Sequence, residues 1–181
     1  MVYVALLRGI NVGGHNKVEM KQLKATFESI GLRKVVTYIN SGNIIFEDNT
    51  KKAADLVSSI EQAIKTDFLL DIKVILRSFD RLQTICQKLP KDWVKNEIMR
   101  TDILFLWDAI DLPNIVEQLP ITKIDNVIYT PGAILWNVLD KNYDNSGMLK
   151  LMTSKLSKSM TIRNVNTFRK IFQIMETIKE E

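Results

Sequence analysis

Apolar residues near the start of the chain follow first the spacing of a strand and then that of a helix. Residues 2–7 form a continuous apolar run, which is typical of a central strand. Apolar side chains then recur at helical spacing at Met20, Leu23, Phe27 and Ile30. Gly31 is placed to end that helix in the left-handed conformation. The pattern therefore predicts a strand and then a helix.

The pattern from residue 34 to residue 76 adds two strands, a helix and a fourth strand. Residues 34–39 and 44–47 are predicted strands, and the Asn40-Ser41-Gly42-Asn43 stretch between them has the composition of a hairpin turn. A second helical stripe runs from Ala53 to Ile64, with Asn49 or Thr50 as its N-cap. Residues 72–76 complete the order β-α-β-β-α-β, which is that of a ferredoxin-like unit.

The second half of the chain repeats part of this order. The predicted elements are a helix over 80–89, a strand over 102–107, a short helix after Pro113, a hairpin of 127–130 and 133–139 turning at Pro131-Gly132, a short helix over 147–156, and a last helix capped by Thr161. This half has no predicted closing strand. We therefore predict an α+β fold of two ferredoxin-like subdomains packed together, with the second one incomplete.

The two subdomains differ in what they carry. Residues 1–78 hold a glycine-rich loop, and residues 79–181 hold basic C-terminal helices. The chain is 46% hydrophobic and 25% charged, which is the balance of a globular protein. Its apolar runs are far shorter than the ~20 residues of a membrane span, and its N-terminus lacks the features of a signal peptide. We expect a cytoplasmic protein without membrane contact.

The numbers of cysteine and histidine residues limit the disulfide, metal and catalytic chemistry that the chain can carry. Cys86 is the only cysteine and His15 the only histidine, so neither an internal disulfide nor a zinc site is expected. Cys86 lies in a helical pattern that favours an inert buried thiol over a catalytic one. We therefore expect no metal and no cofactor.

Residues 8–17 form a long loop between the first strand and the first helix. Glycines at positions 9, 13 and 14 let backbone N–H groups approach an anion, and the start of the helix adds partial positive charge. Arg8 and Lys17 add full charges. The loop matches neither the dinucleotide-binding nor the P-loop signature. It therefore predicts an anion cradle, and the alternative is a wide turn that needs two glycines.

Several short motifs together resemble the signature of a widespread, mostly bacterial family of unknown function. They are ALLRGINVGG at residues 5–14, Met20, Gly31, TYI at 37–39, SGN at 41–43, and Thr161, Arg163, Asn164, Asn166 and Thr167 near the C-terminus. Glu19, Asn40 and Val165 stand where that family commonly has Pro, Gln and Trp. The resemblance implies a shared fold and marks these positions as ones that matter, but it implies no substrate.

Two further motifs are candidate binding residues. Ser41 and Asn43 belong to the predicted hairpin turn, and Tyr38 belongs to the strand before it. We expect this turn at the opposite end of adjacent strands from the glycine-rich loop, so that the two do not form one pocket unless Tyr38 or Asn40 reaches across the sheet. With Thr161 as N-cap, Arg163 falls in the first turn of the last helix, where a cation opposes the helix dipole. Such a residue can hold a phosphate or carboxylate. The alternatives are a structural turn and an arginine extended into solvent.

The net charge of +4 is unevenly placed. Residues 141–181 hold eight basic and four acidic side chains, so the rest of the chain is neutral overall. An anionic partner is therefore to be sought at the C-terminal segment, unless its charges only solvate helix faces.

These observations favour a binding module for a phosphorylated ligand, either a nucleotide or a nucleic-acid backbone. The alternatives are an enzyme that acts on a small anionic substrate, with His15 as its acid–base group, and a protein-interaction or dimerisation module. No residue is assigned a catalytic role, and the oligomeric state stays open. The candidate ligand-binding residues are Arg8, Asn11, Gly13, Gly14, His15, Asn16, Lys17, Tyr38, Ser41, Asn43, Arg163 and Asn164.

Overall fold

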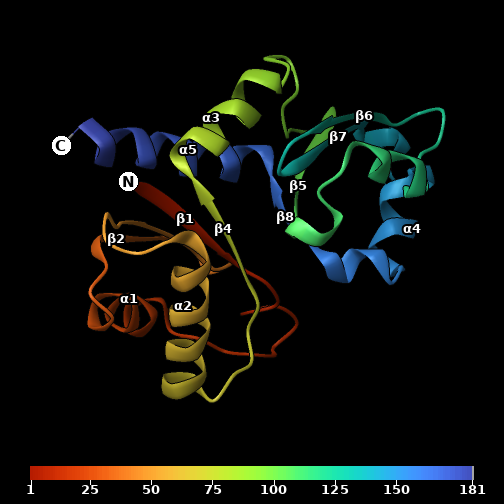
Figure 1. The fold of residues 1–181 in the computed structure, drawn as a ribbon. Helices are drawn as coiled ribbons and strands as arrows, with labels where there is room; N and C mark the ends of the chain where they lie inside the picture. The colour runs from red at the N-terminus through yellow and green to blue at the C-terminus, as the bar shows by residue number, and fades with distance from the viewer. Residues whose placement is uncertain (181) are drawn as a thin grey trace. The chain divides into compact units, whose positions relative to one another are not determined.

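The computed structural model describes residues 1–180, which fold as two compact units. The first unit consists of Met1–Phe79 together with the chain from Ile171 onward, and the second is Asp80–Lys170. Figure 1 follows the chain through both units by colour. None of the described helices is long and apolar enough to cross a membrane.

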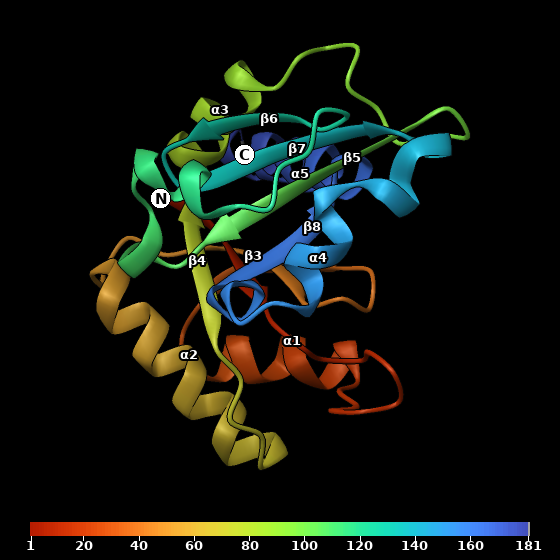
Figure 2. The ribbon, with the colours of Figure 1, turned by 90° about the vertical axis from the view of Figure 1, so that its right-hand side faces the viewer.

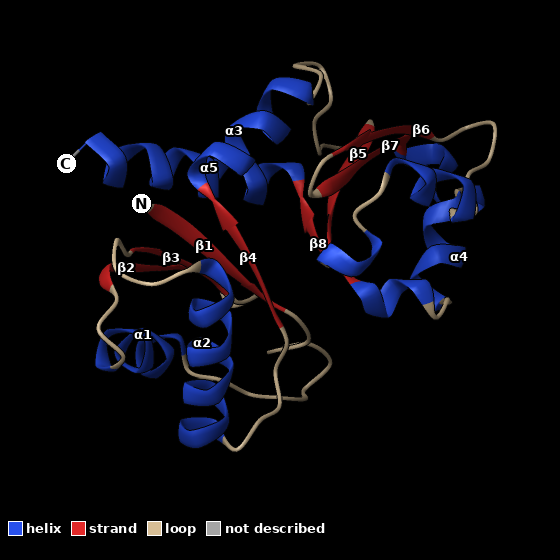
Figure 3. Cartoon of the chain, viewed as in Figure 1, coloured by secondary structure: helices blue, strands red, loops and turns tan. Residues whose placement is uncertain are grey.

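The first unit is built on an antiparallel sheet with the strand order β2-β3-β1-β4. Its elements are β1 (Val2–Leu7), α1 (Met20–Ser29), β2 (Arg33–Tyr38), β3 (Asn43–Glu47), α2 (Ala53–Phe68) and β4 (Val74–Ser78). Both helices lie on the same face of the sheet, as the colouring by secondary structure shows (Figure 3). This is the predicted ferredoxin-like order.

The core of the first unit explains the continuous apolar run of β1. Tyr3, Ala5 and Leu7 point from one face of β1 into a cluster formed with α1 and α2. Val2, Val4 and Leu6 point to the opposite face and are buried as well. Because both faces of β1 are covered, the strand carries no polar alternation.

The end of the last helix, α5 (Val165–Glu180), belongs to the first unit. The Phe172 ring stacks on Phe79, with 5.3 Å between the ring centroids. Lys179 Nζ lies 4.1 Å from the centroid of the same Phe79 ring. Lys34 Nζ donates to the Ile178 carbonyl oxygen at 3.2 Å. The first unit is therefore built from two separate stretches of the chain.

The second unit repeats the topology of the first, with the strand order β6-β7-β5-β8. Its strands are β5 (Met99–Leu106), β6 (Asn126–Thr130), β7 (Ala133–Leu139) and β8 (Met160–Asn164), and its helical elements are α3 (Phe79–Lys88, from Asp80 onward), η1 (Asp108–Ile110), η2 (Pro113–Gln118), η3 (Asp140–Asn145), α4 (Gly147–Thr153), η4 (Leu156–Ser159) and the start of α5. Figure 2 shows the four strands side by side in this order.

The predicted α+β fold with two ferredoxin-like subdomains is confirmed, but the second subdomain is not incomplete. Its closing strand is β8, which pairs antiparallel with β5, so that Arg163 lies opposite Ile103. Arg77 of β4 lies opposite Val4 of β1 in the same way. Each unit therefore carries a buried arginine at the equivalent position of its closing edge strand. The predicted subdomain boundaries stay a prediction.

Two predicted helix caps are wrong. Thr161 lies inside β8, and the residue that caps α5 is Asn164, whose Oδ1 accepts from the Thr167 N–H at 3.0 Å. The N-cap of α2 is Lys52 rather than Asn49 or Thr50. Asp48 fixes the turn before that helix instead, since its carboxylate accepts from the N–H groups of Thr50 and Lys51.

Asp125 fastens the chain before β6 to the start of α4. Its Oδ1 accepts from Trp136 Nε1 at 3.0 Å and from Ser146 Oγ. Its Oδ2 accepts from the N–H and the hydroxyl of Thr122 and from the Gly147 N–H at 2.9 Å. These donors hold the pKa of Asp125 below its ordinary value, against the effect of burial. The carboxylate has a structural role.

The pKa of Asp102 in β5 is shifted in the opposite direction from that of Asp125. Burial raises the pKa of Asp102, and the charges of Lys95 and Arg100 oppose that rise only in part. We expect Asp102→Asn to raise the unfolding temperature at pH 7 by about 2 °C or more, because the amide needs no desolvated charge. The gain should fade as the pH falls through the raised pKa of Asp102 and should be absent below the ordinary carboxyl value of about 4, where the side chain is protonated in both the folded and the unfolded state.

Thermal melts of both proteins, followed by circular dichroism at neutral and acidic pH, test this expectation for Asp102. A variant that melts below the wild type at pH 7 contradicts it. So does a gain in unfolding temperature that is the same at both pH values, since the wild-type penalty requires an ionised carboxylate.

Candidate functional site

The side chain of Asn11 joins three segments of the first unit. Its Nδ2 donates to the carbonyl oxygens of Val18 and Asn40, both at 2.9 Å. Its Oδ1 accepts from the Val18 N–H at 2.8 Å. Asn11 itself has a φ of 52°, a left-handed conformation that asparagine tolerates better than most residues. One amide thus connects the glycine-rich loop, the hairpin turn and the chain entering α1.

The glycine-rich loop also closes on itself. Asn16 Nδ2 donates to the Gly9 carbonyl oxygen at 2.8 Å, and the Asn11 N–H donates to the Asn16 carbonyl oxygen at 3.1 Å. Gly13 and Gly14 both have positive φ, which places their N–H groups outside this internal network. Within residues 1–180, no hydrogen bond uses the N–H of Gly13 or Gly14. The loop is ordered while these two donors remain open to a ligand or water.

The loop and the hairpin turn lie at the same end of the sheet, so the expectation that they lie at opposite ends is wrong. β3 runs antiparallel to β1, and the start of β3 therefore lies beside the end of β1, with Leu6 opposite Asn43. The Leu7 N–H donates to the Gly42 carbonyl oxygen at 2.8 Å. A Cβ on Gly42 would lie 2.7 Å from Leu7 Cβ, so only glycine permits this contact.

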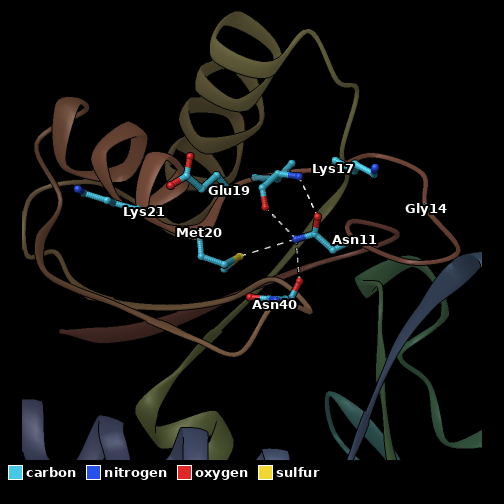
Figure 4. A pocket seen from close by; sticks show the side chains of 8 residues that line it. Asn11, Gly14, Lys17, Glu19, Met20, Lys21 and Asn40 are labelled. Carbon is cyan, nitrogen blue, oxygen red and sulfur yellow. Dashed lines mark hydrogen bonds between the residues drawn. The ribbon is translucent and has the colours of Figure 1, made fainter.

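A pocket of about 550 Å³ opens where these segments meet. It is lined by Asn11, Gly14, Lys17, Val18, Glu19, Met20, Lys21 and Asn40. Figure 4 shows Asn11, Met20 and Asn40 converging at its centre, with Lys17 on the side of Gly14 and Lys21 on the other side. Of the predicted site residues, the pocket brings together Asn11, Gly14 and Lys17.

The first turn of α1 forms one wall of the pocket. Glu19 is the N-cap residue, but its side chain makes no capping hydrogen bond, and the first turn holds no acidic residue. The first N–H groups of a helix have no partner within the helix and carry partial positive charge. Lys17 and Lys21 add full charges, and Glu19 adds one negative charge. The wall is therefore cationic with a single carboxylate.

The other predicted residues of the loop and the turn surround the pocket without lining it. His15 is exposed, and its N–H donates to the Val12 carbonyl oxygen. Asn43 is fully buried, where its Nδ2 donates to Ser41 Oγ and to the Tyr38 carbonyl oxygen, both at 3.0 Å. These three residues build the turn. Arg8, Gly13 and Asn16 shape the loop. Their part in binding stays a prediction.

Arg163 and Asn164 belong to the second unit. Arg163 is only 7% exposed, and its Nη1 donates to Thr161 Oγ1 and to the Ile162 carbonyl oxygen. Burial lowers the pKa of Arg163 to about 10. Arg163 therefore lies in a strand rather than in the first turn of a helix, and the argument from the helix dipole does not apply. Asn164 uses its side chain to cap α5.

The comparisons with known proteins bear on both units. The model of the family described as "Protein of unknown function (DUF1697)" matches residues 1–136. The chain belongs to this family. A conserved bacterial protein of known structure, SP0830 from Streptococcus pneumoniae, is 32% identical over 96% of this chain and 98% of that one, with a TM-score of 0.83. No curated protein matches the chain.

Membership of the DUF1697 family confirms the resemblance to a family of unknown function. The matched residues include every residue that lines the pocket, whereas Arg163 and Asn164 lie beyond the match. Neither the family description nor the name of the pneumococcal protein states a ligand or a reaction. A function for this chain has to be inferred from the pocket itself.

Sequence reasoning missed five residues of the pocket wall, namely Val18, Glu19, Met20, Lys21 and Asn40. Lys21 carries a detectable signal, because a lysine in the first helical turn after a glycine-rich loop is well placed for an anion. Asn40 is expected only as a residue that could reach across the sheet, whereas the structure has its backbone carbonyl oxygen accept from Asn11. A backbone contact of this kind does not show in the residue type.

Proposed function

We propose that this DUF1697 protein is a binding module for a phosphorylated small molecule, and specifically for a nucleotide, at the Asn11 pocket. The observation that carries the proposal is the joining of loop, turn and helix start by the Asn11 side chain, which leaves Lys17, Lys21 and open N–H groups around one pocket. The pocket volume of about 550 Å³ is within the range of small-molecule sites.

Phosphate chemistry fits the cationic side of the pocket. Gly14 and Lys17 both line the pocket and stand on the same side of it in Figure 4, which suits a phosphate that accepts from the Gly14 N–H and from the lysine ammonium. Such charge-assisted bonds are about twice as strong as neutral ones. The hydrogen bonds of Asn11 fix the loop in advance, so binding orders little additional backbone.

Glu19 argues for a nucleotide over a bare phosphate. A carboxylate on the pocket wall repels an anion but accepts hydrogen bonds from hydroxyl or amino groups. A ribose or a base amino group supplies such donors, whereas inorganic phosphate at neutral pH supplies few. A ligand with a phosphate at one end and hydrogen-bond donors at the other therefore suits both charges of the pocket.

The alternatives lack a supporting contact in the described residues. His15, the acid–base group of the enzyme hypothesis, does not line the pocket. The edge strand β2, which the dimerisation hypothesis would use, has a register irregularity between Arg33 and Val36 and a left-handed Lys34. Irregular, basic edges of this kind oppose pairing with another sheet. The geometry therefore favours ligand binding over the enzyme and dimerisation hypotheses.

Calorimetric titration with AMP, ATP and inorganic phosphate tests the proposal. We expect nucleotides to bind, and we expect Lys17→Ala with Lys21→Ala to weaken that binding by about tenfold or more, because charge-assisted bonds are lost. The matched control removes two exposed lysines of the α2 region, Lys52→Ala with Lys65→Ala, and should leave the affinity unchanged.

Glu19→Gln separates a nucleotide site from a phosphate site. If the carboxylate accepts from the ligand, this substitution should weaken nucleotide binding and strengthen phosphate binding. No heat of binding from any of the nucleotides, or equal losses in the Lys17/Lys21 variant and its control, would show the proposal to be wrong.

A further inference from the structure

The C-terminal third of the chain contains a long stretch without acidic residues. Residues 145–175 include six basic side chains and no Asp or Glu. In the second unit this stretch forms α4, η4, β8 and the start of α5. The positive charge of this stretch is therefore not offset by carboxylates within it.

The structure separates five of these six basic residues into two groups; the sixth, Lys170, is exposed on α5. Arg163 is buried in β8, and Arg169 donates to the carbonyl oxygens of Lys91 and Trp93, so both hold the fold together. Lys150, Lys155 and Lys158 are exposed. We name these three exposed lysines the lysine stripe; Lys150 lies on α4, Lys155 lies directly before η4, and Lys158 lies on η4. Figure 2 shows α4 and the turn that follows it next to β8.

The packing of α4 directs this surface outward. Gly147, Met148 and Leu151 are buried against the second core, so the residues between them face away from it. Leu149 and Met152 are accordingly 37% and 53% exposed beside Lys150. The lysine stripe thus consists of exposed cationic side chains, with a little apolar area beside Lys150, on segments whose neighbouring residues pack in the second core.

The extent of the stripe favours one kind of anionic macromolecule. A membrane surface is held by larger amphipathic helices or by clusters of about four to eight basic residues, and α4 has seven residues with two exposed apolar side chains. A nucleic-acid backbone presents closely spaced phosphates that a short row of lysines can neutralise without apolar insertion.

We propose that the lysine stripe binds the phosphate backbone of a nucleic acid. Exposed aromatic side chains do not occur among these residues, so the binding is independent of base sequence. Each lysine replaces one counterion of the backbone, which makes the affinity steeply dependent on salt. This site lies in the second unit and does not rest on the proposed nucleotide pocket.

Fluorescence anisotropy of a labelled single-stranded thymidine oligonucleotide, titrated with the full chain at several salt concentrations, tests the proposal. Three phosphate contacts predict a slope of log K against log salt of about −2. Each single Lys→Gln substitution in the stripe removes one phosphate contact and should make the slope less steep by about 0.7. The triple variant should abolish binding at low salt. Asp144→Asn, which removes the acidic residue just before the stretch, should strengthen binding.

The matched control carries the same change in charge elsewhere, as Lys52→Gln, Lys65→Gln and Lys123→Gln, which are all exposed. Equal losses in the stripe variant and in this control would overturn the proposal, because they would show attraction to net charge only. Binding of anionic phosphatidylglycerol vesicles without binding of the oligonucleotide would overturn it too. Lys17→Ala with Lys21→Ala should leave the oligonucleotide slope unchanged, which keeps this result separate from that of the nucleotide pocket.

Discussion

Replacing Gly147 by alanine is expected to unfold the second unit. A Cβ at this position would lie 1.8 Å from the carbonyl oxygen of Pro120 and 2.7 Å from its carbonyl carbon. Both atoms are backbone, and Asp125 holds Gly147 and the nearby Thr122 in place, so neither side can withdraw. We expect a loss of about 4 kcal/mol or more in the free energy of unfolding, which is in the range of exceptional single substitutions.

The measurement can be confined to the second unit, because all three tryptophans lie in it, at positions 93, 107 and 136. Urea unfolding followed by tryptophan fluorescence should show the loss. Lys150→Ala, on the exposed face of the same helix, is the matched control and should change stability by no more than about 0.5 kcal/mol. A Gly147→Ala protein as stable as this control would contradict the close approach of α4 to Pro120.

Asp125→Ala is expected to destabilise the second unit by about 3 kcal/mol, because it leaves several donors without an acceptor. Trp136 and Ser146 are almost fully buried, so water cannot replace the carboxylate at their side chains. Asp125→Asn keeps one acceptor oxygen and should fall between the wild type and the alanine variant. Urea unfolding followed by tryptophan fluorescence measures the free energy of unfolding of all three proteins.

The same carboxylate also predicts how stability changes with pH. The pKa of Asp125 is lowered in the folded protein, so its contribution is complete above the ordinary carboxyl pKa of about 4 and is lost as the pH falls toward the folded pKa. The difference in unfolding free energy between wild type and Asp125→Ala should therefore shrink in acid. A difference that stays constant down to pH 2 would contradict the ionised, hydrogen-bonded state. Asp92→Ala, exposed in the same unit, is the control.

The first unit shows how far local patterns carry a fold. The helical stripe before Gly31, the two-faced apolar run of β1 and the turn composition around Gly42 each predict an element that the structure contains. These signals are local, since each depends on spacing within one element. The ferredoxin-like order follows from their sequence along the chain, and the structure has it in both units.

The errors arise where a residue type suits two structures. Thr161 has the side chain of an N-cap, and the short, mixed β8 has too few residues to show a strand period. Its Arg163 is polar by type but buried by position, which inverts the usual pattern of an edge strand. Tertiary pairing with β5 therefore outweighs the local signal.

Part of the candidate site could be predicted from the sequence, because some of its residues are neighbours along the chain. Asn11, Gly14 and Lys17 stand in one loop, so the sequence groups them directly. The meeting of that loop with the hairpin turn depends on the antiparallel pairing of β1 and β3. The ferredoxin-like order already implies this pairing, and the expectation of opposite ends failed by overlooking it. The Asn11 contact with the Asn40 backbone needs coordinates.

The division of the first unit into two stretches of chain has a consequence for synthesis. On the ribosome, residues 1–79 of the unit that bears the Asn11 pocket are made before the second unit, whereas Phe172 and Ile178 of the same unit are made after it. The second unit is complete in the nascent chain once Lys170 has emerged. The usual N-terminal-first order of cotranslational folding therefore cannot by itself complete the contacts of the first unit. The stacking of Phe172 on Phe79 can form only after the second unit has been synthesised in full.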